Sequence, residues 1–470
     1  KKKFQQLKKQ LKRKDIDLVI NACDAGREGE LIFTYVYELA GCKHQVKRLW
    51  MLSMTDQSIK EAFANLRDGE ELKPLQDAAR CRSESDWLVG INGTRAVTIK
   101  RSRGRSRQVS TVGRVQTPTL SLVISREHEI RAFVAKTFHK IIADFQINEG
   151  TYSGVYQRSD FKKNQNDKHD KIDRIWNADE ASSILSSVQS SELAQVSETK
   201  KRSPQAANKL YDLTSLQREA NRLHHLPASR TLQLAQSLYE RHKAITYPRT
   251  DSKALPEDYG PTCSELLGVI PGSLAMHAQK VLDNGWVDPK NKKIFNNKQI
   301  SDHFAIIPTN TPPSNLDANE AKIYQLITKR FISVFYPPAQ WDITTRTSLV
   351  GEHSFKTEGK VLVEPSWLAI YGKDNQPSDT LPALVADDED RAKLLSSEIV
   401  SDQTKPPPRY SEATLLSAME SAGKLLEDDE LAEAMKEKGL GTPATRAATI
   451  EHLIKEKYVR REGTQLHPSI

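Results

Sequence analysis

A tyrosine and an arginine two residues apart could act together on a phosphodiester. Tyr247 and Arg249 lie in the run Ala-Ile-Thr-Tyr-Pro-Arg-Thr-Asp-Ser at residues 244–252. A free tyrosine phenol is a poor nucleophile at neutral pH because its pKa is about 10. A fixed guanidinium can stabilise both the phenolate and the charge that builds up on an attacked phosphate. In an extended segment, residues i and i+2 face the same side, so Arg249 is expected beside the phenol. By itself such a pair is usually ordinary protein surface.

An acidic loop far upstream supports a catalytic role for the tyrosine. Residues 17–23 read as a buried strand and lead into Asp-Ala-Gly-Arg-Glu-Gly-Glu at residues 24–30, which we name the acidic loop. Open α/β sheets bind ligands at the carboxyl ends of their parallel strands. Asp24 and Glu28 are hard oxygen ligands of the kind that suits Mg²⁺. The two glycines of the loop are expected to permit tight backbone turns. The competing interpretation is a solvated acidic loop that caps a helix.

Composition limits the class of protein. A chain of 470 residues is too long for one core, and 69 Lys and Arg against 61 Asp and Glu give a net charge of +8. Basic residues cluster at 1–14 and 100–107, which suits a polyanionic partner, although 1–14 also fits the solvated face of a helix. Four isolated cysteines predict a reducing compartment and no zinc site. No phosphate-binding glycine loop points to ATP. We find no membrane span or signal peptide and expect a cytoplasmic protein.

Three further runs complete the pattern. They are Ser-Thr-Val-Gly-Arg-Val-Gln-Thr-Pro-Thr-Leu at 110–120, Asp-His-Phe-Ala-Ile-Ile-Pro-Thr at 302–309 and Gly-Leu-Gly-Thr-Pro-Ala-Thr-Arg-Ala at 439–447. Together with the acidic loop and residues 244–252, in this order, they resemble the type IA DNA topoisomerases, with the topoisomerase III branch closest. The resemblance covers nearly the whole chain, and five ordered motifs make it specific.

The resemblance implies roles for individual residues. Tyr247 would be the nucleophile that holds a 5′ phosphate and leaves a free 3′ hydroxyl, and Arg249 would neutralise that phosphate. His303 would contact the scissile phosphate, while Asp24 and Glu28 would bind Mg²⁺, with Glu28 also taking part in catalysis. The residues expected to bind DNA are Thr111, Arg114, Gln116, Arg80, Arg82, Asn92, Arg95, Thr445 and Arg446.

One position departs from the pattern of the family. Many relatives carry a second aspartate where this chain has Gly26, so one carboxylate fewer should weaken Mg²⁺ binding. We expect Gly26→Asp to strengthen it. The chain also opens on a basic helix that leads straight into the strand before the acidic loop. A single parallel strand cannot bury itself, so we expect an amino-terminal portion to be missing.

The expected fold class is multidomain α/β and mainly α, with a partial Toprim α/β domain and helical domains joined by a β arch. The resemblance implies a padlock-shaped toroid around a hole. The expected segments are a partial Toprim domain at 1–56, a helical DNA-binding domain at 57–133 and 373–470, a β arch at 134–214 and 341–372 with a mobile loop at 157–174, and a helical domain with the tyrosine at 215–340. Within them the sequence pattern predicts helices at 76–88 and 117–129, a helix that begins near Ser215 with Thr214 as its cap, strands at 138–145, 152–156, 341–349 and 355–362, and a strand pair at 458–467.

The leading functional prediction is an ATP-independent type IA topoisomerase that relaxes negative supercoils or unlinks DNA through a transient single-strand break. Its expected partners are single-stranded segments and supercoiled or linked duplex DNA, with no membrane. The resemblance adds a helicase or a single-strand-binding protein as a candidate partner and a location at the nucleoid. Two alternatives stay open: a tyrosine recombinase, which would need no acidic metal loop, and a truncated, non-catalytic module that only binds single strands.

Overall fold

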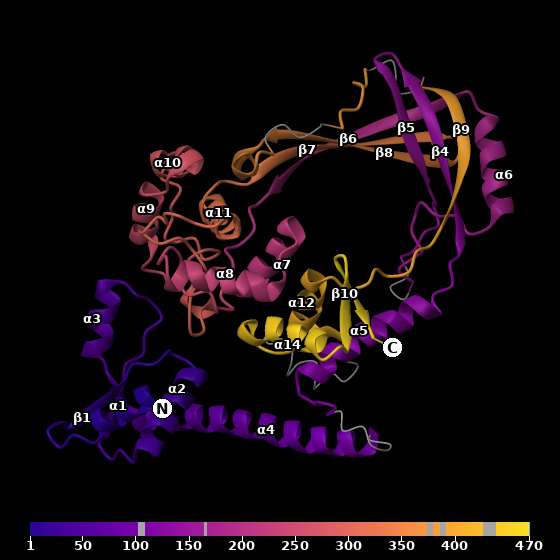
Figure 1. Ribbon diagram of the computed structural model, residues 1–470. Helices are drawn as coiled ribbons and strands as arrows, with labels where there is room; N and C mark the ends of the chain where they lie inside the picture. Colours follow the sequence, from indigo (N-terminus) through magenta and orange to yellow (C-terminus); the bar gives the residue numbers. More distant parts are fainter. Residues whose placement is uncertain (102–108, 164–166, 374–378, 386–391, 426–438, 470) are drawn as a thin grey trace. The chain divides into compact units, whose positions relative to one another are not determined.

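The structure is a computed structural model that describes residues 1–101, 109–163, 167–373, 379–385, 392–425 and 439–469 (Figure 1). It consists of two compact units, each assembled from segments that are distant in the sequence. Unit 1 contains residues 1–127, 208–335 and 409–470, and unit 2 contains residues 128–207 and 336–408. Most of the basic cluster at 100–107 lies outside the described residues.

The beginning of unit 1 is a small α/β layer. Its elements are α1 (Lys2–Leu11), β1 (Leu18–Asn21), α2 (Arg27–Ala40), β2 (Gln45–Arg48), α3 (Asp56–Ala64), β3 (Arg67–Asp68) and the 3₁₀ turn η1 (Gly69–Leu72). The strand order is β1-β2-β3, with β1 parallel to β2, as the position of the acidic loop required. The expectation that β1 is buried was wrong, because β1 is an edge strand and Leu18 and Ile20 are 39% and 37% exposed.

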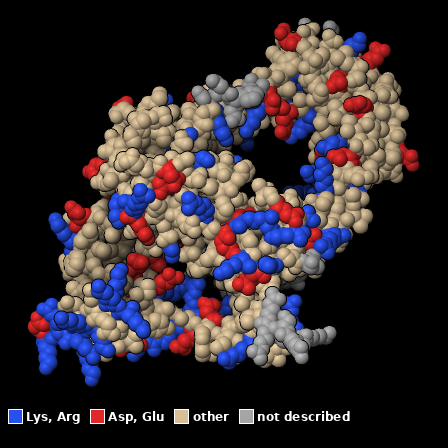
Figure 2. All heavy atoms as spheres, in the orientation of Figure 1, with Lys and Arg blue, Asp and Glu red and all other residues tan. Residues whose placement is uncertain are grey.

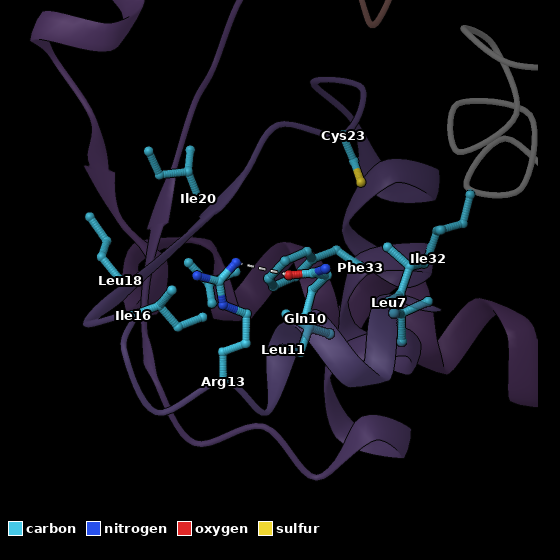
Figure 3. A pocket seen from close by; sticks show the side chains of 12 residues that line it. Leu7, Gln10, Leu11, Arg13, Ile16, Leu18, Ile20, Cys23, Ile32 and Phe33 are labelled. Carbon is cyan, nitrogen blue, oxygen red and sulfur yellow. Dashed lines mark hydrogen bonds between the residues drawn. The ribbon is translucent and has the colours of Figure 1, made fainter. Parts of the chain in front are cut away.

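Helix α1 confirms the predicted amphipathic segment. Its leucines, Leu7 and Leu11, line an apolar hollow of about 450 Å³ together with residues of β1 and α2, among them Ile32 and Phe33 (Figure 3). No residue of α1 is buried, and its lysines are solvent-exposed apart from Lys8, which is partly exposed. The basic cluster of residues 1–14 is therefore the solvated face of a helix in this structure.

Long helices follow. Helix α4 (Lys73–Arg101) is 29 residues long, whereas the pattern predicted only 76–88. Helix α5 (Gln116–Ala132) agrees with the predicted helix at 117–129. The carboxyl-terminal helices, α12 (Glu412–Glu420), the 3₁₀ turn η6 (Ala422–Leu425) and α14 (Pro443–Lys455), pack near α5 and end in the hairpin of β10 (Val459–Glu462) and β11 (Gln465–Pro468). The predicted strand pair at 458–467 is thereby confirmed.

The middle of unit 1 carries the tyrosine. Its helices are α7 (Leu213–His224), α8 (Ala228–Glu240), α9 (Gly260–Gly268), α10 (Ala275–Asp283) and α11 (Ala318–Ser333), with 3₁₀ turns η2 (Gly272–Leu274) and η3 (Asn297–Gln299). Their core includes Leu216, Leu234, Ile306 and Ile327. Helix α7 starts two residues earlier than the sequence predicted, because its cap is Asp212, whose carboxylate accepts from the Ser215 amide at 2.7 Å.

Unit 2 is a closed antiparallel barrel of order β4-β5-β8-β7-β6-β9. Its elements are β4 (Thr137–Ile147), β5 (Gly150–Gln157), α6 (Ala178–Gln189), β6 (Leu193–Gln205), β7 (Ala339–Val350), β8 (His353–Glu364), the 3₁₀ turn η4 (Ser366–Tyr371) and β9 (Ala392–Gln403). The prediction that the two β segments pair with each other is confirmed by β6 against β7 and β5 against β8.

Two parts of unit 2 differ from the expected pattern. Strand β9 lies within the range expected to be helical, because its hydrogen-bonding partner is the distant β4 rather than a neighbour in the chain. The expected mobile loop has no helix or strand at 158–163 and 167–174, and 164–166 lie outside the described residues.

Candidate active site

Two extended segments pair to place Tyr247. We name residues 244–252 the tyrosine segment and residues 302–309 the histidine segment. The Thr246 amide donates to the Ile307 carbonyl at 3.0 Å, and the Thr309 amide donates to the Ala244 carbonyl at 3.0 Å. The Thr250 hydroxyl donates to the carbonyl of His303 at 2.7 Å. The two motifs, far apart in the sequence, therefore form one antiparallel pair.

The paired segments bring Tyr247 and His303 into contact. Their ring centroids are 4.4 Å apart, and the ring of Tyr239 from α8 lies 5.3 Å from that of Tyr247 on an edge-to-face geometry. Pro248 is buried, whereas Arg249 is exposed and Tyr247 is only partly buried. This alternation is that of an extended strand and supports the expectation that Arg249 and Tyr247 face the same side.

The surroundings of Tyr247 disfavour its phenolate when DNA is absent. Burial raises the pKa of the Tyr247 phenol above its usual value, and the negative charges of Asp24 and Glu28 raise this pKa further. The Arg249 guanidinium acts in the opposite direction and lowers the same pKa. The phenol is therefore protonated at neutral pH, and added positive charge beside it is what would make the oxygen a better nucleophile.

The acidic loop meets the histidine segment through Asp24. Its Oδ2 lies 3.4 Å from Nε2 of His303. The hydrogen bond to His303 lowers the pKa of Asp24, and the charges of His303 and Arg48 lower it further against the opposing effect of burial. Asp24 is therefore a carboxylate that orients the imidazole. The structure thus brings the tyrosine segment, the acidic loop and the histidine segment together at one place.

A second contact joins the same two parts of unit 1. The carboxylate of Asp258 accepts hydrogen bonds from Ser53 Oγ at 2.9 Å and Thr55 Oγ1 at 2.7 Å. Ser53 and Thr55 follow β2, and Asp258 follows the tyrosine segment. This contact holds the layer that carries the acidic loop against the segment that carries Tyr247.

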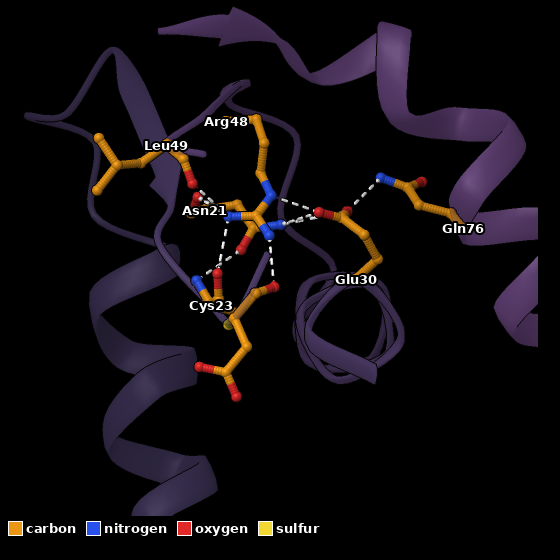
Figure 4. Close-up of polar contacts among 7 residues, drawn as sticks. Asn21, Cys23, Glu30, Arg48, Leu49 and Gln76 are labelled. Carbon is orange, nitrogen blue, oxygen red and sulfur yellow. Dashed lines mark hydrogen bonds and ion pairs between the residues drawn. The ribbon is translucent and has the colours of Figure 1, made fainter. Parts of the chain in front are cut away.

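A buried arginine fixes the base of the acidic loop (Figure 4). Arg48, at the end of β2, is 1% exposed and pairs with Glu30, which is fully buried. Its guanidinium also donates to the carbonyls of Asn21, Cys23 and Asp24 at 3.0, 2.8 and 2.6 Å. Glu30 is therefore a structural residue, since its carboxylate faces Arg48 in the interior rather than the tyrosine.

The two glycines of the acidic loop lie where a side chain would come close to neighbouring atoms. Gly26 has φ −164° and ψ 179°, and Gly29 lies in the first turn of α2, so neither adopts a backbone conformation that requires glycine. A Cβ at Gly29 would lie 2.2 Å from the carbonyl oxygen of Asp24, and a Cβ at Gly26 would lie 2.0 Å from Oδ1 of Asp302. The expected tight turn is present, because the Gly26 amide donates to the Asp24 carbonyl at 2.8 Å, but it does not depend on a glycine conformation. The atoms nearest to a Cβ at Gly26 belong to the end of the flexible Asp302 side chain, so Asp302 has to move in Gly26→Asp, and the effect of this substitution on Mg²⁺ binding stays a prediction.

Asp302 is the residue that the sequence reasoning missed. It precedes His303 in the sequence, and no local pattern shows that it reaches the acidic loop. Burial raises the pKa of Asp302, the charge of His303 opposes this rise, and the charges of Glu28 and Asp24 are among those that add to it. A carboxylate beside a glycine of a distant motif can be found only once the fold is known.

The acidic loop offers two carboxylates, those of Asp24 and Glu28, as candidate ligands for a metal ion. In the described part of the chain, no three Asp, Glu, His or Cys side chains converge closely enough to hold a metal ion by themselves. Mg²⁺ needs less, because it keeps several waters and is held by one or two carboxylates together with substrate phosphates. The exposed carboxylates of Asp24 and Glu28 fit that requirement.

Helix α4 and the third motif lie side by side. The Val112 amide donates to Thr94 Oγ1 at 3.0 Å, and Arg114 pairs with Asp86 of α4. The Gln116 side chain donates to Thr111 Oγ1 at 2.9 Å. The third motif is therefore held against α4 through Val112 and Arg114, while Gln116 and Thr111 are fixed to each other within the motif.

The predicted DNA-binding residues on α4 differ in the partners and in the solvent exposure of their side chains. Arg80 pairs with Glu38 of α2, and the Asn92 amide bonds to the Leu88 carbonyl of its own helix. Arg95 is exposed and Arg82 is partly exposed. Lys and Arg side chains are distributed over much of the visible face, with acidic side chains between them (Figure 2).

The fifth motif supplies support. Arg446 is 4% exposed, and its guanidinium donates to the Leu440 carbonyl and to Thr214 Oγ1 of α7, both at 3.0 Å. Thr445 belongs to the capping box of α14 together with Thr442. Burial of Arg446 lowers its pKa. In this structure the two residues hold α14 in place, and neither presents a free side chain to a ligand.

Comparison with known proteins agrees with this site. The family model described as DNA topoisomerase matches residues 70–470. DNA topoisomerase 3 of Bacillus subtilis strain 168 is 39% identical over 479 residues, covering 99% of this chain and 63% of the relative. DNA topoisomerase 3 of Shouchella clausii is 38% identical over 475 residues, covering 98% of this chain and 62% of the relative. The chain therefore spans somewhat less than two thirds of the length of these relatives.

The fold comparison points the same way. A crystal structure of full-length topoisomerase I from Thermotoga maritima matches with a TM-score of 0.68 and 23% identity, covering 100% of this chain and 71% of that one. The chain belongs to the DNA topoisomerase family. Within that family it is a type IA protein of the topoisomerase III branch, as the sequence predicted. Among its described helices, none is long and apolar enough to cross a membrane.

Proposed function

We propose that this chain breaks and rejoins a single DNA strand through Tyr247, without ATP, and so relaxes negative supercoils or unlinks DNA. The observation that carries the proposal is the meeting of Tyr247, His303 and Asp24 from three separate motifs. Such convergence has no evident purpose in the fold alone, because each side chain is at least partly exposed to solvent.

The chemistry exchanges one phosphoester for another. The Tyr247 oxygen attacks the phosphorus, an O–P bond forms, and the bond from phosphorus to the 3′ oxygen breaks. The phenol loses a proton and the leaving 3′ oxygen gains one, so the step needs no oxidant, reductant or nucleotide. Rejoining is the reverse reaction, which explains how the break is sealed without ATP.

The charge and the position of each residue near Tyr247 suit a different role in strand cleavage. Arg249 lowers the pKa of the Tyr247 phenol and would neutralise the phosphate. His303 lies against the Tyr247 ring with its Nε2 3.4 Å from Oδ2 of Asp24, and a ring N–H of this histidine would donate to a phosphate oxygen. Asp24 and Glu28 would hold Mg²⁺, which supplies further positive charge against the DNA backbone when bound.

The single strand would be held by exposed residues rather than by every residue the sequence indicated. Arg82 and Arg95 of α4, with Arg114 and Gln116 beside them, are at least partly exposed, and Arg114 would exchange its exposed partner Asp86 for a phosphate. Phosphate contacts of this type position the strand and carry no sequence information. Relaxation versus unlinking as the main activity, and a helicase or single-strand-binding protein as a partner, rest on the family resemblance.

The test is the covalent adduct. The chain is incubated with a single-stranded oligonucleotide, denatured, and resolved by gel electrophoresis. We expect an adduct with the parent chain and with Tyr239→Phe, which loses the neighbouring phenol, and none with Tyr247→Phe. An adduct that persists in Tyr247→Phe would show that another residue is the nucleophile. If the parent forms no adduct yet binds the strand, the chain is the non-catalytic binding module.

A further inference from the structure

Trp87 is the most exposed aromatic side chain of the described residues. It lies midway along α4, the long helix of Figure 1, and 63% of its surface is open to solvent. Among the residues that the structure describes, its indole N–H has no hydrogen-bond acceptor, and its ring contacts no other ring or cation. Single exposed apolar side chains are common on protein surfaces, so the surroundings of Trp87 decide whether its ring has a ligand.

The indole ring lies beside the third motif. Thr94 is seven residues, or about two turns, further along α4 and therefore on the same side of the helix as Trp87. Its Oγ1 accepts from the Val112 amide at 3.0 Å. Asp86, the residue before Trp87, pairs with the exposed Arg114. A ligand that reaches Arg114 is thus close to the face of the tryptophan ring.

The chain around Trp87 is basic and lacks carboxylates. From residue 87 to residue 126 the sequence has no Asp or Glu and eight Lys or Arg, at positions 95, 100, 101, 103, 105, 107, 114 and 126. Those at 103, 105 and 107 lie outside the described residues, whereas Arg95 and Arg114 are exposed in the structure. This charge suits a polyanion. A second copy of the same surface would be repelled by it, so the occupant that the charge favours is a nucleic acid.

We propose that Trp87 is a stacking platform for an unpaired base of the DNA strand whose phosphates the neighbouring arginines neutralise. The inference rests on the proposed function, which brings a single strand to α4, and it adds a contact to the bases. Every base has a π face, so an indole ring on a basic surface accepts any sequence. In a duplex the bases are already stacked on one another. Trp87 therefore favours single strands, which phosphate contacts alone do not do because both forms of DNA carry phosphates.

The direct test compares two strands that differ only in their bases. A labelled oligothymidylate of about 12 nucleotides and a fully abasic strand of the same length are titrated with the chain, and binding is followed by fluorescence anisotropy. Loss of one stacked base should weaken binding of the oligothymidylate by Trp87→Ala about 5- to 150-fold. Binding of the abasic strand should change by less than about twofold, since its phosphate contacts are unaltered. Trp87→Phe keeps a ring and should stay within about threefold of the parent on both strands.

The matched control is Val89→Ala. Val89 is 45% exposed and lies two residues further along, on the opposite side of α4. It should change the affinity for either strand by less than about twofold. The log–log salt slope of Trp87→Ala should equal that of the parent, because the ring neutralises no phosphate. Equal circular dichroism spectra and thermal melts would show that the variants are folded.

Three results would overturn the inference. They are equal losses on the two strands, a loss in Trp87→Phe as large as in Trp87→Ala, and unchanged DNA binding together with weaker self-association in sedimentation, which would assign the ring to a contact between copies. The adduct assay on the same preparations separates this inference from the proposed function. A parent without a Tyr247 adduct refutes the function, and a loss confined to the base-bearing strand would still support stacking. A parent that forms the adduct but binds both strands independently of Trp87 refutes only the stacking role.

Discussion

Replacing Arg48 should loosen the acidic loop more than any surface change near it. In Arg48→Met, the buried Glu30 carboxylate loses its cation, and the carbonyls of Asn21, Cys23 and Asp24 lose a donor. Removing one partner of a buried ion pair typically costs about 3–5 kcal/mol. The side chains of Asn21 and Gln76 still donate to Glu30 at 3.3 and 3.2 Å, which places the expected cost towards the lower end.

Hydrogen exchange read by mass spectrometry suits this prediction, because a chain of two units need not unfold in one step. Amide protection in β1, the acidic loop and β2 should fall by up to about two orders of magnitude, since 1.4 kcal/mol is a factor of about ten. Arg67→Met is the matched control, because Arg67 faces Arg48 in the strand register but is exposed. It should change protection by less than about threefold.

The double variant separates charge from packing. In Arg48→Met with Glu30→Met, no buried charge is left unpaired, so much of the lost protection should return. Protection in Arg48→Met that stays within about threefold of the parent would refute the reasoning, since it would mean that the pair contributes no more than a surface contact. A double variant less protected than Arg48→Met would show that hydrogen bonds to the loop, rather than the ion pair, dominate.

Two further predictions concern the glycine contact and the DNA surface. Gly29→Ala places a Cβ 2.2 Å from the Asp24 carbonyl oxygen, so it should cost about 1–3 kcal/mol of local stability and lower the adduct yield. Gly268→Ala, where a Cβ meets nothing within 4 Å, should leave both measurements unchanged, and equal behaviour of the two would count against the contact. Arg95→Ala should reduce the log–log salt slope for single-strand binding by about 0.7, the contribution of one phosphate. Lys8→Ala in the solvated α1 should leave the slope unchanged, and an effect there would place DNA on α1 instead.

Local sequence patterns predicted the helices and strands whose formation depends on residues that are neighbours in the chain. The amphipathic α1, the strands β4, β5, β7 and β8 and the terminal hairpin all follow from periodicity. Strand β9 does not, because its sequence Ala-Lys-Leu-Leu-Ser-Ser-Glu-Ile-Val-Ser-Asp-Gln has no clean alternation and pairs with residues far away. The cap of α7 was misplaced because Asp212 and Thr214 are both good caps, and only the structure shows which one bonds the helix amide.

The candidate site shows the same division. Tyr247, His303 and Asp24 were predicted from residue types in ordered motifs, and the structure brings them together. The roles of Glu30, Arg446 and Asp302 could not be predicted, because each depends on burial or on a partner that is distant in the sequence. A carboxylate in the interior and one at a ligand site look alike in sequence, and only the position of Arg48 separates Glu30 from Glu28.

The central claim is that Tyr247 links to the 5′ phosphate of a broken strand. The most direct measurement compares two preparations of one single-stranded oligonucleotide, labelled at its 3′ end or at its 5′ end, after incubation with the chain and denaturation. The 3′ label should migrate with the protein, and proteolysis should leave it on the peptide that contains Tyr247. The 5′ label should be released on a fragment that ends in a 3′ hydroxyl. The reverse pattern, or a label on another peptide, would contradict the account.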